Sequence, residues 1–310
     1  MLERLRSTLR LPLGPMTVHE LRSRMRNQQS YSVLTLYMLV AGGVTLLVYI
    51  TASAMGSSGI DDSSRVGSAL FYIVVAMQTL LVSFVTPWFS AGALSSEREG
   101  HTYDLLRLTL ITPRQLVTSK FLSGYGFTVL LVFASLPLLS LALLLGGVDV
   151  GQLAAALAVI LATGFLFSCL ALYISCCQRS TTDAMILTYT TVLGIVIGVS
   201  VLTLIALPML NGVLYRSSTV VRTRPFLAEL IQLVQYVLMS CSPISTLAVS
   251  ETSLLQSGHL LSMTVDPIPG MTTPFNIPAP FLITTLLYLT TGILLLWLTV
   301  RHLSRPNPND

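Results

Sequence analysis

Six long apolar runs dominate this sequence and constrain what it can fold into more than any other feature. Each run holds about 20 or more mostly apolar residues, which is the length an α-helix needs to cross about 30 Å of membrane hydrocarbon. The runs are Tyr31–Met55, Gly67–Leu94, Phe121–Leu145, Leu153–Cys177, Ala184–Leu210 and Phe281–Val300. They predict an all-α polytopic membrane protein with six transmembrane helices, formed as a single transmembrane domain over residues 1–310.

The composition excludes the soluble alternatives. Charged residues make up only 10% of the chain and hydrophobic residues 53%, whereas soluble domains carry about a quarter charged residues. A chain of this kind lacks the polar surface to cover itself in water. We therefore expect a multi-pass protein of the cell membrane, in contact with membrane lipids and without a nucleic-acid partner.

A seventh apolar stretch, Phe226–Val249, is interrupted by Ser240, Ser242 and Pro243. We interpret it as a re-entrant helical hairpin before the last span, and a spanning helix remains the alternative. The positive-inside rule favours six spans, because a seventh would move Arg301 and Arg305 to the outer side. Both termini are then predicted to be cytoplasmic and residues 211–280 extracytoplasmic. The basic residues left outside are Arg65, Arg216, Arg222 and Arg224.

Capping patterns at four predicted helix starts on the cytoplasmic side agree with this topology. In such a pattern a Ser or Thr side chain and a residue three positions later satisfy each other's backbone N–H groups. The four patterns are Thr17-x-x-Glu20, Ser96-x-x-Glu99, Thr112-Pro113-x-Gln115 and Ser180-x-x-Asp183.

The predicted spans contain no Asp, Glu, Lys, Arg or His. Ion-coupled transporters and voltage sensors depend on such residues inside the bilayer, so the chain offers no means of using an ion gradient. Gln78 is the most polar residue in a span, and an interhelical hydrogen bond explains it better than a substrate contact.

Enzyme and cofactor motifs are also missing. The only lysine, Lys120, lies in Thr-Ser-Lys-Phe rather than behind a glycine run, so a phosphate-binding loop for ATP is excluded. The string Gly56-Ser57-Ser58-Gly59 resembles a membrane serine protease motif, but no span supplies the histidine base. The cysteines and histidines show no metal-ligand spacing. We expect neither catalytic activity nor a cofactor, and any energy has to come from a partner.

Two cytoplasmic segments are more organised than simple loops. Residues 1–30 include an amphipathic stretch, Pro15–Gln29, which predicts a helix lying in the membrane interface with its arginines near anionic headgroups; positive-inside charge without a further role is the alternative. Residues 95–120 combine a charged cluster, paired leucines and a Thr-Pro helix start. An ordinary solvated hairpin is the alternative there.

The second segment resembles the permease subunits of ABC-2 type transporters. The resemblance rests on Glu97-Arg98-Glu99-Gly100-His101-Thr102, then Leu105-Leu106, then Thr112-Pro113-Arg114. His101 is an insertion relative to that pattern, and Ser119 replaces the glycine before Lys120. Glu20 to Arg26 is similar to the interface helix of this family, and Ser242-Pro243 resembles the turn of its outer hairpin.

The resemblance implies the permease subunit of an ATP-binding-cassette exporter, which works as a dimer with separate ATP-binding subunits. The cytoplasmic segment 95–120 would be a coupling helix that docks on the ATPase, with the interface helix beside it. The residues that it implicates in coupling are Glu97, Arg98, Glu99, Gly100 and Thr102, supported by Glu20, Arg22, Arg24 and Arg26.

Three questions stay open at this stage. The second functional hypothesis is a membrane scaffold or assembly protein that binds a cytoplasmic partner and transports nothing. The sequence does not distinguish a homodimer from a heterodimer. A neutral, apolar interior suits lipids, drugs, peptides and lipid-linked polysaccharides equally well as substrates.

Overall fold

The structure is a computed structural model that describes residues 28–54, 60–100, 112–145, 148–216, 225–247, 262–265 and 275–304. Within them, six helical segments are long and apolar enough to cross a membrane, which confirms the six predicted spans and the multi-pass class. These segments are Ser30–Thr51, Val66–Glu99, Pro113–Leu144, Val150–Cys177, Thr181–Leu210 and Pro280–Leu303.

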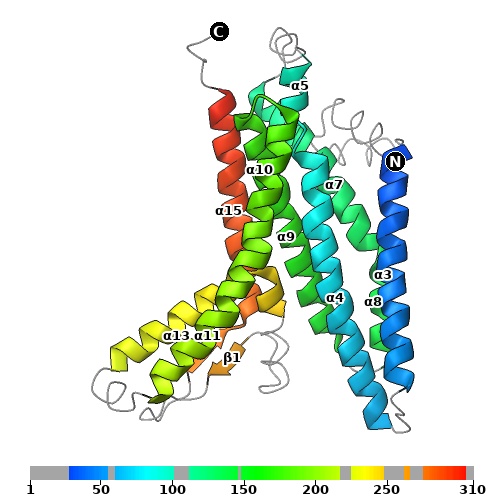
Figure 1. Ribbon diagram of the computed structural model, residues 1–310, viewed down its shortest axis with the longest axis vertical. Coiled ribbons are helices and arrows are strands. Elements are labelled where there is room, and N and C mark those ends of the chain that lie inside the picture. The colour runs from blue at the N-terminus through cyan, green and yellow to red at the C-terminus, as the bar shows by residue number, and fades with distance from the viewer. Residues whose placement is uncertain are drawn as a thin grey trace, which may run out of the picture.

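Four spans are built mainly on one helix each: α3 (Gln28–Ala54), α4 (Ile60–Ser90), α9 (Val150–Cys177) and α15 (Pro280–Leu303). The short helix α5 (Ser95–Glu99) follows α4 after a tight turn. In Figure 1, α5 lies at the end of the bundle where α3 begins and α15 ends. The described ends of the chain therefore lie on one side, as an even number of spans requires.

The other two spans are composite. The third consists of α7 (Pro113–Ala134) and α8 (Leu136–Leu144), which meet at Ser135. Pro137 accounts for this break, because it has no backbone N–H and its ring crowds the carbonyl four residues earlier. The fifth runs through α10 (Thr181–Leu193), the π-helical turn η1 (Gly194–Gly198) and α11 (Val199–Arg216).

Helix α9 is the centre of the bundle, with α4, α7, α10 and α15 packed around it. Its neighbours approach closely at two glycines. A Cβ at Gly164 would lie 2.8 Å from the Thr128 methyl group on α7, and one at Gly292 of α15 would lie 2.5 Å from the Phe165 ring on α9. Glycine therefore sets the helix spacing on two sides of α9.

The outer spans expose large apolar side chains instead of burying them. Helices α3, α10–α11 and α15 carry many of these exposed residues, among them Leu39, Leu204 and Ile293. A helix in a bilayer satisfies its backbone hydrogen bonds internally and can face hydrocarbon with apolar side chains. The exposed surfaces are therefore those of a membrane-embedded bundle.

The segment before the last span departs from the prediction in one respect. Helix α13 (Pro225–Ser240) ends at a turn over Cys241 and Ser242, and a helical turn follows at residues 243–247, so the predicted interruption is present. Strands β1 (Ser262–Val265) and β2 (Phe275–Pro278) then form an antiparallel ribbon, although the sequence predicted only helices. Helices α11 and α13 diverge from the bundle together, at the end away from α5 (Figure 1).

The capping predictions have different outcomes. Thr112 and Gln115 form the predicted reciprocal capping box at the start of α7. The box at Ser96 is wrong, because α5 begins one residue earlier, after Leu94. Ser180 precedes α10 but its side chain makes no capping bond. The box at Thr17 lies outside the described residues, and a box that the sequence reading missed joins Asp149 and Gln152 at the start of α9.

Candidate functional site

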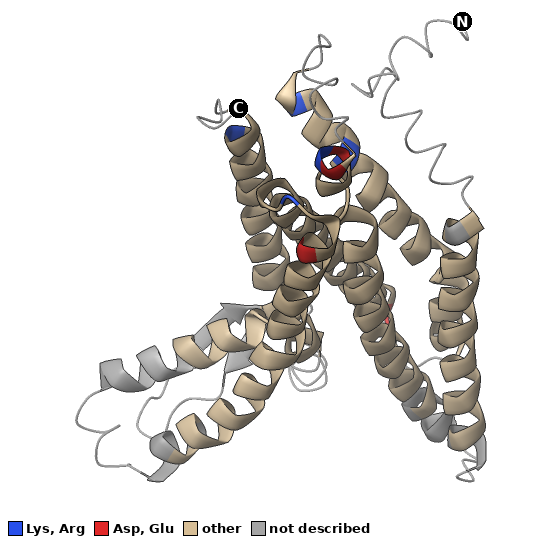
Figure 2. Cartoon of the chain, turned by 45° about the horizontal axis from the view of Figure 1, so that its top comes forward, with Lys and Arg blue, Asp and Glu red and all other residues tan. Residues whose placement is uncertain are grey.

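The charged side chains gather at the α5 end of the bundle. Figure 2 shows acidic and basic residues on α5 and on the neighbouring helix ends. Among the charged side chains that the structure describes, Asp149 lies at the opposite end. The remainder lie at the α5 end: Glu97, Arg98, Glu99, Arg114, Lys120, Arg179, Asp183 and Arg301.

Helix α5 is anchored to α9 through one hydroxyl group. The Ser175 Oγ accepts hydrogen bonds from the backbone N–H groups of Leu94 and Ser95, each at 3.0 Å. It also lies 3.3 Å from the Ser95 hydroxyl oxygen, to which it donates. All three residues are fully buried. Ser175 therefore satisfies N–H groups at the start of α5 that lack a cap from their own helix.

An ion pair connects α5 to α7. The Glu97 carboxylate binds the ammonium group of Lys120, and the two side chains are only 15% and 11% exposed. A partly buried charge pair of this kind holds its helices in one register, because loss of either partner leaves the other charge poorly solvated. The one lysine in the chain is thus part of the site.

A third contact connects α5 to α10. The Glu99 carboxylate accepts from the backbone N–H of Thr181 at 3.1 Å and from the Thr181 hydroxyl. Thr181 is the first residue of α10, so Glu99 caps this helix from outside. A negative charge at a helix N-terminus is also favoured by the helix dipole.

The remaining predicted coupling residues have varied positions. Arg98 interacts electrostatically with Cys176 of α9, whose sulfur lies 3.6 Å from His302 Nδ1 on α15. Gly100 is exposed and ends α5, donating from its N–H to the Ser96 carbonyl at 3.0 Å.

Five of the predicted residues lie outside the part of the chain that the structure describes: Thr102, Glu20, Arg22, Arg24 and Arg26.

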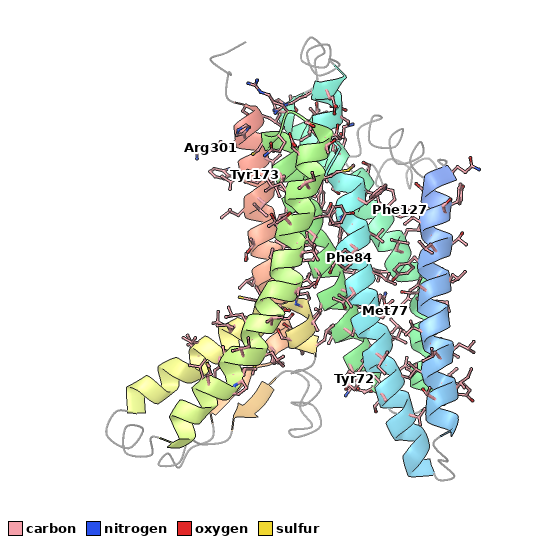
Figure 3. All side chains as sticks on the ribbon, in the orientation of Figure 1. Tyr72, Met77, Phe84, Phe127, Tyr173 and Arg301 are labelled. Atoms are coloured by element: carbon pink, nitrogen blue, oxygen red, sulfur yellow. The ribbon has the colours of Figure 1, made fainter. Side chains whose placement is uncertain are left out.

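Aromatic side chains also lie at the α5 end of the bundle. The Arg301 guanidinium lies 5.1 Å from the centre of the Trp297 ring on α15, a cation–π arrangement suited to a membrane boundary. Figure 3 shows Arg301 and Tyr173 on the same side of the bundle.

Away from this end, hydroxyl and amide groups connect the spans. Gln78 Nε2 donates to the Ser135 hydroxyl at 2.5 Å, joining α4 to the break between α7 and α8. The hydroxyl oxygens of Thr86 and Thr128 lie 3.0 Å apart, as do those of Ser90 and Ser168. The interhelical role predicted for Gln78 is confirmed, and these bonds hold α4 against α7 and α9.

The site is a junction of four helices, α5, α7, α9 and α10. Among the described residues no three His, Cys, Asp or Glu side chains come together as a metal site. Sequence reasoning selected Glu97 and Glu99 but missed their partners Lys120 and Thr181, and it missed Ser175. Lys120 was recognisable as the only lysine, whereas nothing in the sequence marks Ser175 or Thr181.

Comparison with known proteins adds no identification. No protein-family model matches the chain, and no curated protein matches it. The class that the fold defines is therefore a multi-pass helical membrane protein with a charged junction at one end.

Proposed function

We propose that this protein is the permease subunit of an ATP-binding-cassette exporter. In this proposal it forms a substrate path as a dimer and is driven by separate ATPase subunits. The proposal starts from the resemblance of residues 97–114 to ABC-2 type permeases. It places the α5 end on the cytoplasmic side of the cell membrane, where the basic residues of the described helix ends satisfy the positive-inside rule.

The observation that carries the proposal is the way α5 is connected to the spans. Among its five residues, Glu97 contacts α7, Ser95 contacts Ser175 of α9, and Glu99 contacts α10. A force applied to α5 therefore reaches the third, fourth and fifth spans together. A coupling element has to do this, since it converts movement of a soluble partner into rearrangement of packed helices.

The charges on α5 have a dual role in this proposal. Glu97 and Glu99 fasten α5 to the bundle, and the exposed part of the segment meets the ATPase. Arg98 and Gly100 lie at that surface, half-buried and exposed respectively. Adjacent residues of α5 therefore serve two functions, docking on the partner and attachment to the spans. A variant that tests docking has to keep the attachment intact.

The test is purification of the tagged chain from its native membranes in mild detergent. We expect a nucleotide-binding subunit to co-purify, and we expect the purified complex to hydrolyse ATP. A chain that is recovered folded but without a nucleotide-binding protein would contradict the proposal and favour the scaffold hypothesis.

A further inference from the structure

An apolar groove lies between α3, α4 and α8, in the half of the bundle away from α5. Its volume is about 410 Å³, within the range of about 300–1,000 Å³ that is typical of small-ligand sites. In Figure 1, α3, α4 and α8 lie together on one side of the bundle. The groove is separate from the junction at α5.

The floor of the groove offers no free hydrogen-bond donor. Leu70 of α4 is 1% exposed and Thr45 of α3 is 5% exposed. The Thr45 hydroxyl donates to the carbonyl of Ala41 on its own helix, at 2.7 Å. A ligand carbonyl or phosphate oxygen would lose its contacts with water here and find no donor in their place, so the leucine-rich floor favours a hydrocarbon.

The rim of the groove opens toward the surrounding bilayer. Leu46 on one wall and Leu141 and Leu144 on the other are all exposed. Both walls extend over eight residues, from Gly42 to Tyr49 and from Leu138 to Leu145, which is about 12 Å of helix. This length fits within one leaflet of a membrane whose hydrocarbon is about 30 Å thick.

We propose that this groove binds an acyl chain of a phospholipid from the leaflet away from α5. The chain lies along α3 and α8 and fills the space between them, because α3 packs mainly on α4. Tyr49 stands at the end of the groove nearest the membrane surface, where tyrosine is favoured beside lipid headgroups. Bound lipid thereby completes the attachment of the first span to the bundle.

Two glycines of α3 provide a matched pair of variants. Gly42 lines the groove, and its neighbour Gly43 does not. A Cβ at either position would meet no atom within 4 Å, so both sites accept a side chain. Gly42→Leu fills the groove and Gly43→Leu leaves it open.

The experiment uses the full chain in phosphatidylcholine vesicles that contain a phospholipid with a diazirine in the middle of one acyl chain. After illumination, the labelled residues are mapped by mass spectrometry. We expect adducts on the buried floor residues Thr45 and Leu70, loss of these adducts in Gly42→Leu, and their retention in Gly43→Leu. Leu141→Trp, which narrows the groove from the other wall, should cause the same loss if Gly42→Leu does not fold.

Two results would overturn the proposal. One is a wild-type chain labelled only on outward surfaces such as Leu204 and Ile293, with an unlabelled floor, as expected if a protein segment or a second copy occupies the groove. The other is floor labelling that persists in folded Gly42→Leu. Neither result depends on transport or on an ATPase, so the inference stands or fails independently of the proposed function.

Discussion

Glu99 caps a helix that begins more than eighty residues later in the chain. The pattern Ser180-x-x-Asp183 predicts that α10 caps itself, yet the Thr181 N–H is bound by Glu99 and the Ser180 side chain makes no capping bond. A carboxylate is a stronger partner for a helix N-terminus than a hydroxyl, because it adds charge to the hydrogen bond. The contact with Glu99 therefore takes the place of the cap that the neighbouring residues predict.

The first prediction follows from this exchange of caps. Glu99→Ala should lower the melting temperature of the purified protein, since it removes both hydrogen bonds to Thr181. Ser180→Ala should leave it unchanged. Thermal unfolding in detergent checks both variants, and a greater loss in Ser180→Ala than in Glu99→Ala would show that the assigned cap is incorrect.

The second prediction concerns the pair formed by Glu97 and Lys120. Glu97→Lys alone should destabilise the protein by about 3–5 kcal/mol, the usual cost of leaving a buried charge without its partner, because two ammonium groups then face each other. Adding Lys120→Glu restores an ion pair in the opposite direction and should recover most of this loss. The double-mutant cycle measures the coupling, and additive effects of the two substitutions would argue against the pair.

At the scale of the helix, sequence reasoning succeeded where hydrocarbon decides the outcome. The six spans were predictable because each needs only length and apolarity. The break at Ser135 depends on Pro137, which was visible but was not interpreted. The β1–β2 ribbon was missed because two strands of four residues carry little periodic signal. The contacts of Ser175, Lys120 and Thr181 could not be predicted, because they depend on which helix ends meet.

The third prediction tests the packing of α9 against α15. Gly292→Ala should destabilise the protein by about 1–3 kcal/mol, as overpacking does, because the new Cβ would lie 2.5 Å from the Phe165 ring. Gly43→Ala is the control, since no atom lies within 4 Å of the added methyl group. Equal melting temperatures for the two variants would mean that α15 does not approach α9 as described.

For the whole molecule, the distribution of charge predicts its orientation. The described basic side chains lie at the α5 end, which the positive-inside rule assigns to the cytoplasm. Cys177 is exposed at this end, at the last residue of α9, whereas Cys169 and Cys176 are buried. One native thiol therefore reports which side of the membrane the α5 end occupies.

The fourth prediction uses that thiol. A membrane-impermeant maleimide should label Cys177 in inside-out vesicles and not in right-side-out vesicles, and Cys177→Ser should abolish the difference. Cys241, which is partly exposed elsewhere in the chain, is replaced by serine in both proteins to remove its signal. Labelling of Cys177 in right-side-out vesicles would reverse the proposed topology.

The central claim is that α5 transmits the action of an ATP-hydrolysing partner to the spans. The most direct measurement compares the wild-type chain with the Glu97→Lys, Lys120→Glu double variant in the same co-purification from membranes. This exchange preserves an internal ion pair, while it reverses the sign of the net charge of α5, which carries two carboxylates and one guanidinium in the wild type. We predict that both proteins melt at similar temperatures, that the wild type retains a nucleotide-binding subunit, and that the double variant loses it. A folded double variant that retains the ATPase as the wild type does, or a wild type that carries no ATPase, would contradict the account.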